Sequence, residues 1–215
     1  MIEGKSVING KKTHAVNTTS FFTYDANKSS QLPQKYDNAT LEEIEYSCEI
    51  ASQVFSDYAA TASTIRAAFL MEIKAELETT KTSIIEQYKL ESGYPEGRAE
   101  GEFSRTLGQI QSFVDLLIEG SYVDAILDVG KAGVPDLRKM KHPIGPIVVF
   151  GASNFPLAFS TAGGDTISAL AAGCPVILKG HPYHAGTSEL VAQAIQSAIN
   201  KRGLPAGIFA HLHGE

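Results

Sequence analysis

Apolar residues recur at helical spacing between residues 40 and 78 and predict two helices. Thr40 and Glu43 have the spacing of a capping box, which marks the start of the first helix. The second helix is expected from about Ser63 to Glu78. The apolar stripe is Ile44, Cys48, Ala51 and Phe55 in the first helix, and Ile65, Phe69, Ile73 and Leu77 in the second. The residues expected to face solvent in the second helix are Arg66, Lys74 and Glu76. Cys48 is therefore predicted to be a small core residue.

Further helices are expected between residues 83 and 120. A short helix is predicted near Ser83, and a long one follows the break at Gly93-Tyr94-Pro95 and ends at Gly120. The apolar stripe of the long helix is Phe103, Leu107, Ile110, Val114 and Leu117. Acidic residues exceed basic ones between Thr40 and Glu100, and most lie opposite the apolar stripes, so they are interpreted as solvated faces. The whole block is predicted to be a helical layer.

Two segments with more polar patterns flank this layer. Residues 1–38 are polar, with few aromatic residues, and are interpreted as an extended arm. After the layer, Ser121–Asp128 predicts a strand, Gly130–Pro135 a turn, and Asp136–Lys141 a polar returning strand. A two-stranded ribbon of this kind is marginal alone and needs a partner surface. It is a candidate oligomerisation element.

The last third of the chain alternates short apolar runs with helical stretches. The runs are Pro146–Gly151, Pro175–Lys179 and Gly207–Leu212, as expected for strands buried on both faces. The stretches between them, Asp165–Ala172 and Ser188–Lys201, predict helices. This βαβαβ order predicts an α/β fold with a parallel, Rossmann-type half-sheet.

Composition narrows the function classes. The chain has 215 residues and a net charge of −6, which argues against a nucleic-acid surface built on bulk charge. It has no apolar run long enough for a membrane span and no signal-peptide pattern, so a cytoplasmic protein is expected. Cys48 and Cys174 are too far apart for a zinc or redox motif, and Cys174 is expected to pack at the entrance of a strand. His181 with His184, and His211 with His213, lack a third metal ligand, so no metal is predicted.

Candidate ligand-binding residues follow the predicted strands, because ligands of open parallel sheets bind beyond the carboxyl ends of the strands. The segments in this position are 151–156, 179–182 and 213–215, and no G-x-G-x-x-G follows the first strand. Asn154 can donate a hydrogen bond to an oxyanion or support the turn before Pro156, and spacing alone favours the turn. Lys179 can meet ribose or phosphate, or it can be an ordinary strand-end lysine.

At these residues the sequence resembles the aldehyde dehydrogenase superfamily. The similar stretch runs from PIGPIVVFGASNFPLAF through AGGD to KGHPYHAGTSELV, and the helices from Thr40 to Gly120 match in order. The resemblance implies the N-terminal half of an aldehyde dehydrogenase-like fold. Within the superfamily, the AGGD and KGHP segments look most like 2-oxoglutarate semialdehyde (2,5-dioxopentanoate) dehydrogenases and NADP-dependent fatty aldehyde dehydrogenases.

The resemblance implies roles for individual residues. It makes Asn154 the residue that donates a hydrogen bond to the oxyanion, whereas spacing alone favours a role in supporting the turn. Phe155 and Ala158 match the substrate tunnel. The positions that match the cofactor-binding segments are Phe150, Gly151, Ala152, Lys179, His181 and Pro182. Pro182 replaces a glutamate that holds the ribose in NAD-preferring relatives, so nothing there repels a 2′-phosphate, and NADP is favoured over NAD.

The resemblance also implies that the 215 residues lack the family's nucleophilic cysteine and general-base glutamate. The expected organisation is an arm and helical layer at 1–120, the ribbon at 121–145 and the first βαβαβ half of the cofactor domain at 146–215, with the catalytic domain absent. The expected protein is part of an NAD(P)-dependent aldehyde dehydrogenase, inactive alone and homo-oligomeric at full length. The alternatives are a non-catalytic nucleotide-binding or subunit-pairing module and, less favoured, an acyl-phosphate or acyl-CoA reductase.

Overall fold

A capping box at one helix start and glycines at two helix ends mark boundaries within the helical layer. In a computed structural model that describes residues 1–13 and 18–215, helix α1 spans Leu41–Ala59 and begins at the predicted capping box. The Thr40 hydroxyl accepts a hydrogen bond from the Glu43 N–H, and the Glu43 carboxylate accepts one from the Thr40 N–H. Helix α3 spans Glu96–Glu119 and ends at Gly120, whose positive φ of 85° suits glycine. Both predicted ends are confirmed.

Helix α2 is a single helix over Ser63–Ser92, so the prediction of two separate helices is wrong. No glycine or proline lies between Leu77 and Ser83, and the buried face continues through Ile84, Ile85 and Tyr88. The helix stops only at Gly93, which has a positive φ of 70°.

Several predictions about helix faces are also wrong, and Ile44 and Ile65 of the predicted apolar stripes are exposed. Cys48 is exposed, because the buried face of α1 is rotated by one position and consists of Ser47, Ala51 and Tyr58. Arg66 is buried rather than solvated. Its guanidinium donates to the carbonyls of Ala171 and Thr61 and, over 2.8 Å, to the hydroxyl of Tyr122, so it ties α2 to the chain segments around it.

The described part of residues 1–38 is not the predicted extended arm. Residues 14–17 lie outside the described part of the chain. The described residues form strands β1 (Val7–Ile8), β2 (Lys11–Lys12), β3 (Ser20–Asp25) and β4 (Ser30–Asp37). β3 and β4 pair as an antiparallel hairpin, and β1 adds to the main sheet. The sequence interpretation missed β1 and β2 because they have only two residues each.

The predicted βαβαβ unit is present and forms most of the main sheet. Its strands are β7 (Ile147–Phe150), β8 (Val176–Lys179) and β9 (Phe209–Leu212), which pair in parallel. Helices α4 (Gly164–Ala172) and α5 (Ala185–Arg202) connect them, with the short helices η2 (Pro182–His184) and η3 (Ala206–Ile208) in the connections. The full strand order is β2-β1-β9-β8-β7, with β1 antiparallel to β9.

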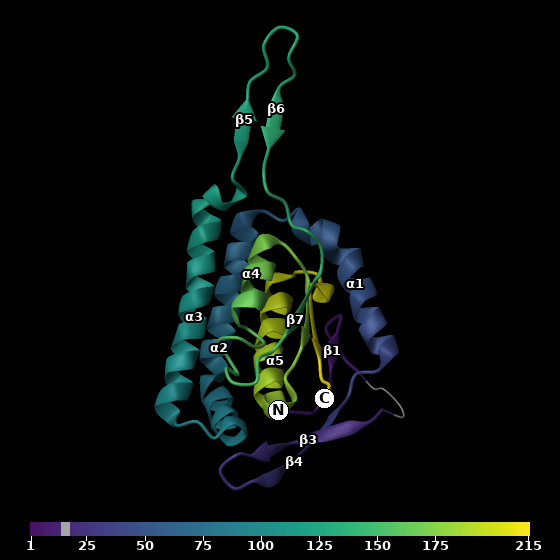
Figure 1. Ribbon diagram of the computed structural model, residues 1–215, viewed down its shortest axis with the longest axis vertical. Coiled ribbons are helices and arrows are strands. Elements are labelled where there is room, and N and C mark those ends of the chain that lie inside the picture. Colours follow the sequence, from purple (N-terminus) through teal and green to yellow (C-terminus); the bar gives the residue numbers. More distant parts are fainter. Residues whose placement is uncertain (14–17) are drawn as a thin grey trace.

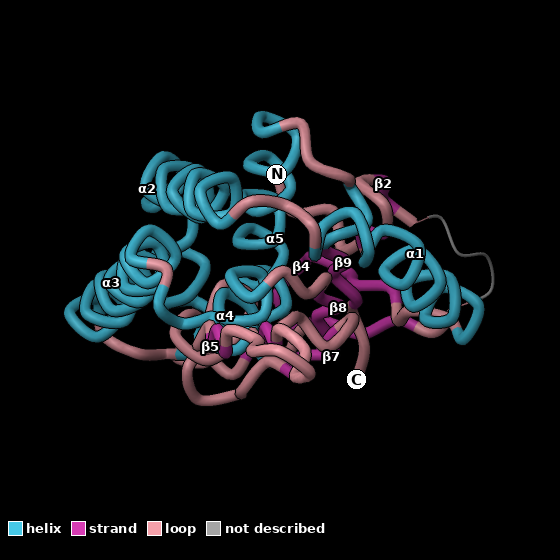
Figure 2. The backbone as a smooth tube through the Cα atoms, turned by 90° about the horizontal axis from the view of Figure 1, so that it is seen from above, coloured by secondary structure: helices cyan, strands magenta, loops and turns pink. Residues whose placement is uncertain are grey.

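Alternating side chains of β8 explain why helices cover both faces of the sheet. Val176 and Leu178 pack into the large core with the helices α2, α3, α4 and α5, whereas Ile177 packs with Ala51 of α1 on the opposite face. Figure 2 shows α1 on one side of the strands and α2 and α3 on the other. The α/β fold class is confirmed.

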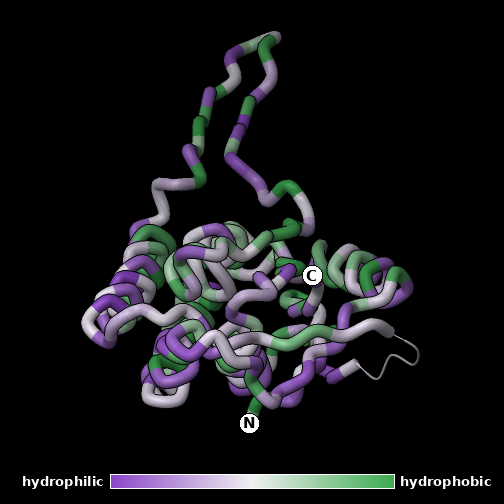
Figure 3. The backbone as a smooth tube through the Cα atoms, turned by 60° about the horizontal axis from the view of Figure 1, so that its bottom comes forward, coloured by the Kyte–Doolittle hydropathy of each residue, from purple (hydrophilic) through white to green (hydrophobic). Residues whose placement is uncertain are grey.

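The ribbon projects away from the rest of the molecule (Figure 1). It consists of the short helix η1 (Ser121–Val123) and the antiparallel strands β5 (Ile126–Asp128) and β6 (Leu137–Lys139). The predicted first strand is therefore shorter than expected. Hydrophobic and hydrophilic positions alternate along the ribbon in Figure 3, and its exposed apolar residues include Ile126, Leu127, Val129, Val134 and Leu137. None of the helices in the described part of the chain is long and apolar enough to cross a membrane.

Candidate functional site

The loop between β7 and α4, residues 151–163, closes on itself directly beyond the end of the strand. The Gly151 N–H donates to the Lys179 carbonyl over 3.0 Å, which continues the β7–β8 pairing by one residue. The Ala152 N–H then donates to the Phe159 carbonyl over 2.9 Å and closes the loop. A Cβ on Gly151 would lie 2.7 Å from Ser160 Oγ, so this close approach requires glycine. Phe150, the last residue of β7, is exposed.

Asn154 is exposed in this loop, and its carboxamide is free. Its backbone carbonyl accepts a hydrogen bond from Arg98 Nη2 over 3.1 Å. Within the described residues no hydrogen bond engages its side chain, so the side chain does not support the turn. It borders a cavity of about 260 Å³ whose other lining residues are Glu91, Ser92, Tyr94, Ser153, Pro156, Tyr183 and His184. The geometry leaves this amide available to a ligand.

The two residues assigned to a substrate tunnel have different surroundings. The Phe155 ring is partly exposed and packs edge to face on Phe159, with 5.1 Å between the ring centroids. The Arg98 guanidinium lies 5.1 Å from the Phe155 ring and 3.8 Å from the Tyr94 ring. Ala158 is fully buried and does not line the cavity beside Asn154.

Glu102 of α3 binds the backbone of the loop at Leu157 and Ala158. One oxygen of its buried carboxylate accepts the backbone N–H groups of Leu157 and Ala158 over 2.8 and 2.9 Å. The other oxygen accepts the Tyr88 hydroxyl over 2.7 Å. Burial raises the pKa of the Tyr88 phenol, and the hydrogen bond to Glu102 adds to this, so Tyr88 remains a donor at neutral pH. Hydrogen bonds to charged groups each contribute about 1.5–3 kcal/mol.

Lys179 and His181 lie together at the end of β8. Burial lowers the pKa of the Lys179 ammonium, and the Glu215 carboxylate opposes this shift. Gly214 packs against the lysine, because a Cβ there would lie 3.3 Å from Lys179 Cε. Burial, and then the charge of Lys179, lowers the pKa of His181, whose Nδ1 accepts the Tyr183 N–H over 3.2 Å. Pro182 is partly buried and opens η2.

His184 connects the two candidate ligand-binding segments. Its Nε2 lies 2.9 Å from the Ala152 carbonyl, and because a carbonyl only accepts, this nitrogen carries the proton. Its ring stacks on His181 with 5.6 Å between the centroids. Burial lowers the pKa of His184 to about 4, so the side chain is neutral at pH 7.

The N-terminus of α5 is occupied by a side chain of the chain itself. The buried Glu91 carboxylate accepts the Gly186 and Thr187 N–H groups over 2.8 Å and the Thr187 hydroxyl over 2.7 Å. Burial raises the pKa of Glu91, and these hydrogen bonds oppose the shift. The helix end that could have received a phosphate is therefore capped.

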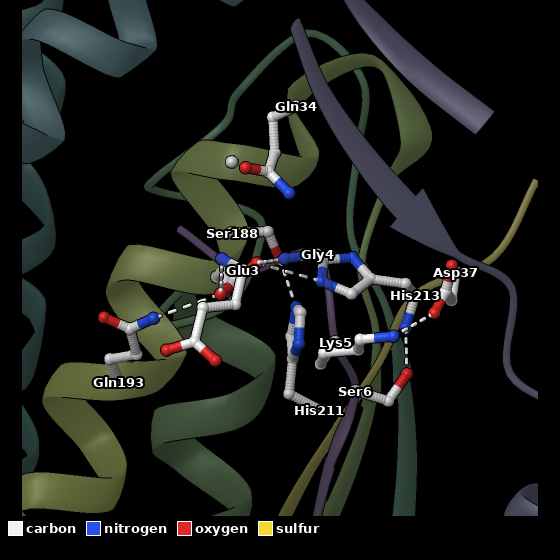
Figure 4. A network of polar contacts seen from close by, with 12 residues as sticks. Glu3, Gly4, Lys5, Ser6, Gln34, Asp37, Ser188, Gln193, His211 and His213 are labelled. Carbon is white, nitrogen blue, oxygen red and sulfur yellow. Dashed lines mark hydrogen bonds and ion pairs between the residues drawn. The ribbon is translucent and has the colours of Figure 1, made fainter. Parts of the chain in front are cut away.

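A second buried polar cluster fixes the N-terminal residues (Figure 4). Glu189 of α5 accepts the Glu3 and Gly4 N–H groups, and His213 Nε2 lies 3.4 Å from this carboxylate. His211 Nε2 lies 2.8 Å from Ser188 Oγ. In the part of the chain that the structure describes, no group of three or more histidine, cysteine or acidic side chains could hold a metal ion.

The sequence interpretation missed several residues that build the site. Glu91 and Glu102 are buried rather than solvated. The sequence signal for this burial is that each has buried neighbours at helical spacing on the same helix. Glu102 lies three residues after Ala99 and four before Thr106, both buried, and so falls within the core stripe of α3. Arg98 and Arg105 flank it at steps of four and three, with Arg105 lying 4.8 Å from the Phe159 ring.

The fold and the loops together define an α/β protein whose candidate ligand-binding residues follow the ends of parallel strands. Its sequence matches the aldehyde dehydrogenase family over residues 17–215, and the chain belongs to that family. The predicted family resemblance is confirmed.

Known relatives also support the predicted branch. The chain is 49% identical over 177 residues to alpha-ketoglutaric semialdehyde dehydrogenase 2 of Azospirillum brasilense, which covers 80% of this chain and 34% of that protein. It is 42% identical over 216 aligned positions to alpha-ketoglutaric semialdehyde dehydrogenase of Acinetobacter baylyi, covering 98% of this chain and 41% of that protein. The chain thus spans about two fifths or less of these relatives.

Solved structures share the fold. Methylmalonate-semialdehyde dehydrogenase from Oceanimonas doudoroffii superposes with a TM-score of 0.85 at 21% identity, covering 100% of this chain and 42% of that chain. An NADP-dependent enzyme of E. coli superposes with a TM-score of 0.83 at 23% identity, covering 99% and 42%. The predicted aldehyde dehydrogenase-like fold is confirmed.

Proposed function

We propose that these residues form the oxyanion-binding and part of the cofactor-binding region of an NAD(P)-dependent aldehyde dehydrogenase. The observation that carries the proposal is the free carboxamide of Asn154, exposed at the end of β7 beside the segment of Lys179 and His181. The substrate class follows from the two relatives named for alpha-ketoglutaric semialdehyde. We therefore propose 2-oxoglutarate semialdehyde as the aldehyde and its carboxylic acid as the product.

Asn154 would act on the charge that develops during attack on the aldehyde. Its carboxamide can donate a hydrogen bond to the aldehyde oxygen. Arg98 holds the backbone of Asn154, so this donor is in place before charge develops on that oxygen. Removing one such donor costs about 10²- to 10³-fold in kcat in enzymes that use an oxyanion hole. Phe155 would face the substrate beside it, and Ala158 would act through packing beneath the loop.

The residues at the ends of β7 and β8 fit a nicotinamide cofactor, which when bound accepts hydride from the substrate. Lys179 is half-buried, packs beside Gly214 and has an ammonium group that can donate hydrogen bonds. Phe150, Gly151 and Ala152 would contact the cofactor from the end of the neighbouring strand, and His181 and Pro182 would contact it just after Lys179. Because Pro182 offers no carboxylate, a 2′-phosphate is not repelled there, and we propose that NADP is preferred to NAD.

The two cysteines are poorly placed to act as nucleophile. Cys174 is buried at the amino end of β8, whereas Asn154 follows the carboxyl end of β7. A four-residue strand separates these ends by about 13 Å. Cys48 lies on α1, outside these loops. We therefore propose that the 215 residues alone turn over no aldehyde. The alternative function, a non-catalytic nucleotide-binding or subunit-pairing module, shares this expectation.

Calorimetric titration of the 215-residue chain with NADP and NAD tests the cofactor proposal. We expect tighter binding of NADP and at least a tenfold rise in its Kd in Lys179→Met, whereas Lys139→Met, which removes the same charge from the exposed ribbon, leaves Kd unchanged. Equal effects of the two variants, or a clear NAD preference, would contradict the assignment. Formation of NADPH from a semialdehyde above the enzyme-free rate would contradict the proposed inactivity.

A further inference from the structure

One face of α3 holds the loop of Asn154 through three side chains. Arg98, Glu102 and Arg105 lie at steps of four and three, so they share one face of the helix. Arg98 donates to the carbonyl of Asn154, Glu102 accepts two backbone N–H groups of the loop, and Arg105 lies against the ring of Phe159. The helical layer thus contacts the loop at Asn154, at Leu157 and Ala158, and at Phe159.

Glu102 makes the most constrained of these contacts. Its carboxylate is buried, and its two oxygens together have three donors, the N–H groups of Leu157 and Ala158 and the hydroxyl of Tyr88. Two consecutive backbone N–H groups that meet one oxygen fix the orientation of the peptide planes between them. The contact therefore determines both the position and the direction of the chain at Leu157.

That constraint is passed to Asn154 over a short and stiff path. Only Phe155 and Pro156 separate Asn154 from Leu157, and the proline ring fixes the φ angle of its own residue. Proline also restricts the backbone of Phe155 to extended conformations. On the other side, Arg98 holds the carbonyl of Asn154 itself and leaves its carboxamide free.

We propose that Glu102 and Arg98 are positioning residues of the aldehyde dehydrogenase reaction, which orient the Asn154 carboxamide toward the aldehyde oxygen without touching substrate or cofactor. This inference rests on the proposed role of Asn154. Side chains of α3, a helix of the helical layer, would thus determine the orientation of the oxyanion donor.

Hydrogen exchange measured by NMR on the 215-residue chain tests the Glu102 contact. In Glu102→Ala we expect the Leu157 and Ala158 amides to exchange at least about tenfold faster, because both lose their acceptor in a buried site. Glu102→Gln should restore protection to within about threefold, because its carbonyl oxygen can accept both N–H groups and its amide can donate to Tyr88. Glu91→Ala is the matched control, since it removes another buried carboxylate and should accelerate exchange only at Gly186 and Thr187.

The carboxamide resonances of Asn154 provide the readout that a merely structural role would not move. We expect them to shift in Glu102→Ala and in Arg98→Met and to return to the wild-type position in Glu102→Gln. Arg105→Met, an exposed substitution on the same face that removes the guanidinium beside the Phe159 ring, should leave them within the experimental error. Unchanged Asn154 resonances in folded Glu102→Ala overturn the proposal.

If Glu102→Ala does not fold, the exposed Arg98→Met variant decides, and unchanged Asn154 resonances in it overturn the proposal. These measurements need neither cofactor nor turnover. If NADP does not bind but the exchange pattern is as expected, the proposed function is refuted and the contact between Glu102 and the loop stands. If NADP binds as expected but the exchange pattern is absent, only the positioning role is refuted.

Discussion

Buried ionisable side chains join the candidate site to the helical layer. Glu91, Glu102 and His184 are each almost fully buried, and each binds a backbone group of a neighbouring loop. Their partners are distant in sequence: Glu91 and Gly186 are 95 positions apart, and Glu102 and Leu157 are 55 positions apart. Sequence spacing predicted the exposed candidates at the strand ends but could not predict these long-range pairs, because hydrophobic periodicity reports only which face of an element is buried.

The depressed pKa of His184 predicts a loss of stability in acid. The unfolded chain takes up a proton near pH 6.5, but the folded chain does so only near pH 4, so unfolding is favoured as pH falls through this window. His211, whose pKa burial also lowers, acts in the same direction, whereas the raised pKa of Glu91 opposes it above about pH 4.5. By linkage, His184 alone accounts for a loss of about 2–3 kcal/mol between pH 7 and pH 4.5.

Chemical denaturation of His184→Gln at both pH values checks this prediction. Glutamine can donate to the Ala152 carbonyl but does not titrate, so the variant should lose about 2–3 kcal/mol less than the wild type on acidification. His142→Gln, which changes a histidine on the exposed chain after the ribbon, serves as the control and should match the wild type. Parallel pH profiles for wild type and His184→Gln would show that the buried ring does not contribute.

At the scale of elements, the sequence identified most helices and strands but not their exact faces or breaks. The capping box at Thr40 and the glycines at 93 and 120 are local signals, and each marks a helix end where predicted. The division of α2 was wrong because it rested on a change of apolar pattern without a residue that breaks helices. The error at Cys48 arose because α1 packs on the sheet with a face that includes the small polar residue Ser47.

Loss of the capping box should weaken α1 measurably. Thr40→Ala removes the hydroxyl that accepts the Glu43 N–H, and we expect a decrease of about 1 kcal/mol in the free energy of unfolding. Thr79→Ala is the control, because its exposed hydroxyl bonds only to the Ala75 carbonyl within α2, and it should be neutral or slightly stabilising. A Thr40→Ala variant as stable as Thr79→Ala would exclude a role for the cap.

The ribbon of β5 and β6 leads to a prediction about assembly. Leu127 and Val129 are 71% and 78% exposed, and an isolated two-stranded ribbon gains little stability from such side chains. If the ribbon pairs subunits, replacing both with lysine should lower the mass measured by light scattering without lowering the melting temperature of the protein. Ile118→Lys, an equally exposed apolar position on α3, should leave the mass unchanged. A mass unaffected by the ribbon substitutions would contradict the oligomerisation role.

At the scale of the whole molecule, the N-terminal segment completes the sheet. β1 covers the outer side of β9, the Gly4 carbonyl accepts the Asp37 N–H, and the Ser6 hydroxyl accepts the His213 N–H. Gly4 has a positive φ, and a Cβ there would lie 1.9 Å from the Lys35 carbonyl oxygen. At the opposite edge, β7 pairs with β8 alone among the described strands and exposes Val148.

Deletion of residues 1–8 should therefore destabilise the chain and promote self-association. The deletion leaves the edge of β9 and the buried carboxylate of Glu189 without their partners. We expect a melting temperature lower by several degrees, at least about 4 °C, and aggregation on concentration. Lys11→Ala, a substitution on the exposed strand β2, should change neither property. An unchanged melting temperature after the deletion would mean that β1 adds no stability to the sheet.

The pairing of β1 with β9 also sets an order of events during synthesis. Val7 is made about 200 residues before its partner His211. At about 5–20 residues per second, the ribosome takes about 10–40 s to produce that partner. During this interval the apolar residues of β1 have no strand to join, so chaperones that act on nascent chains have a long opportunity to bind this segment.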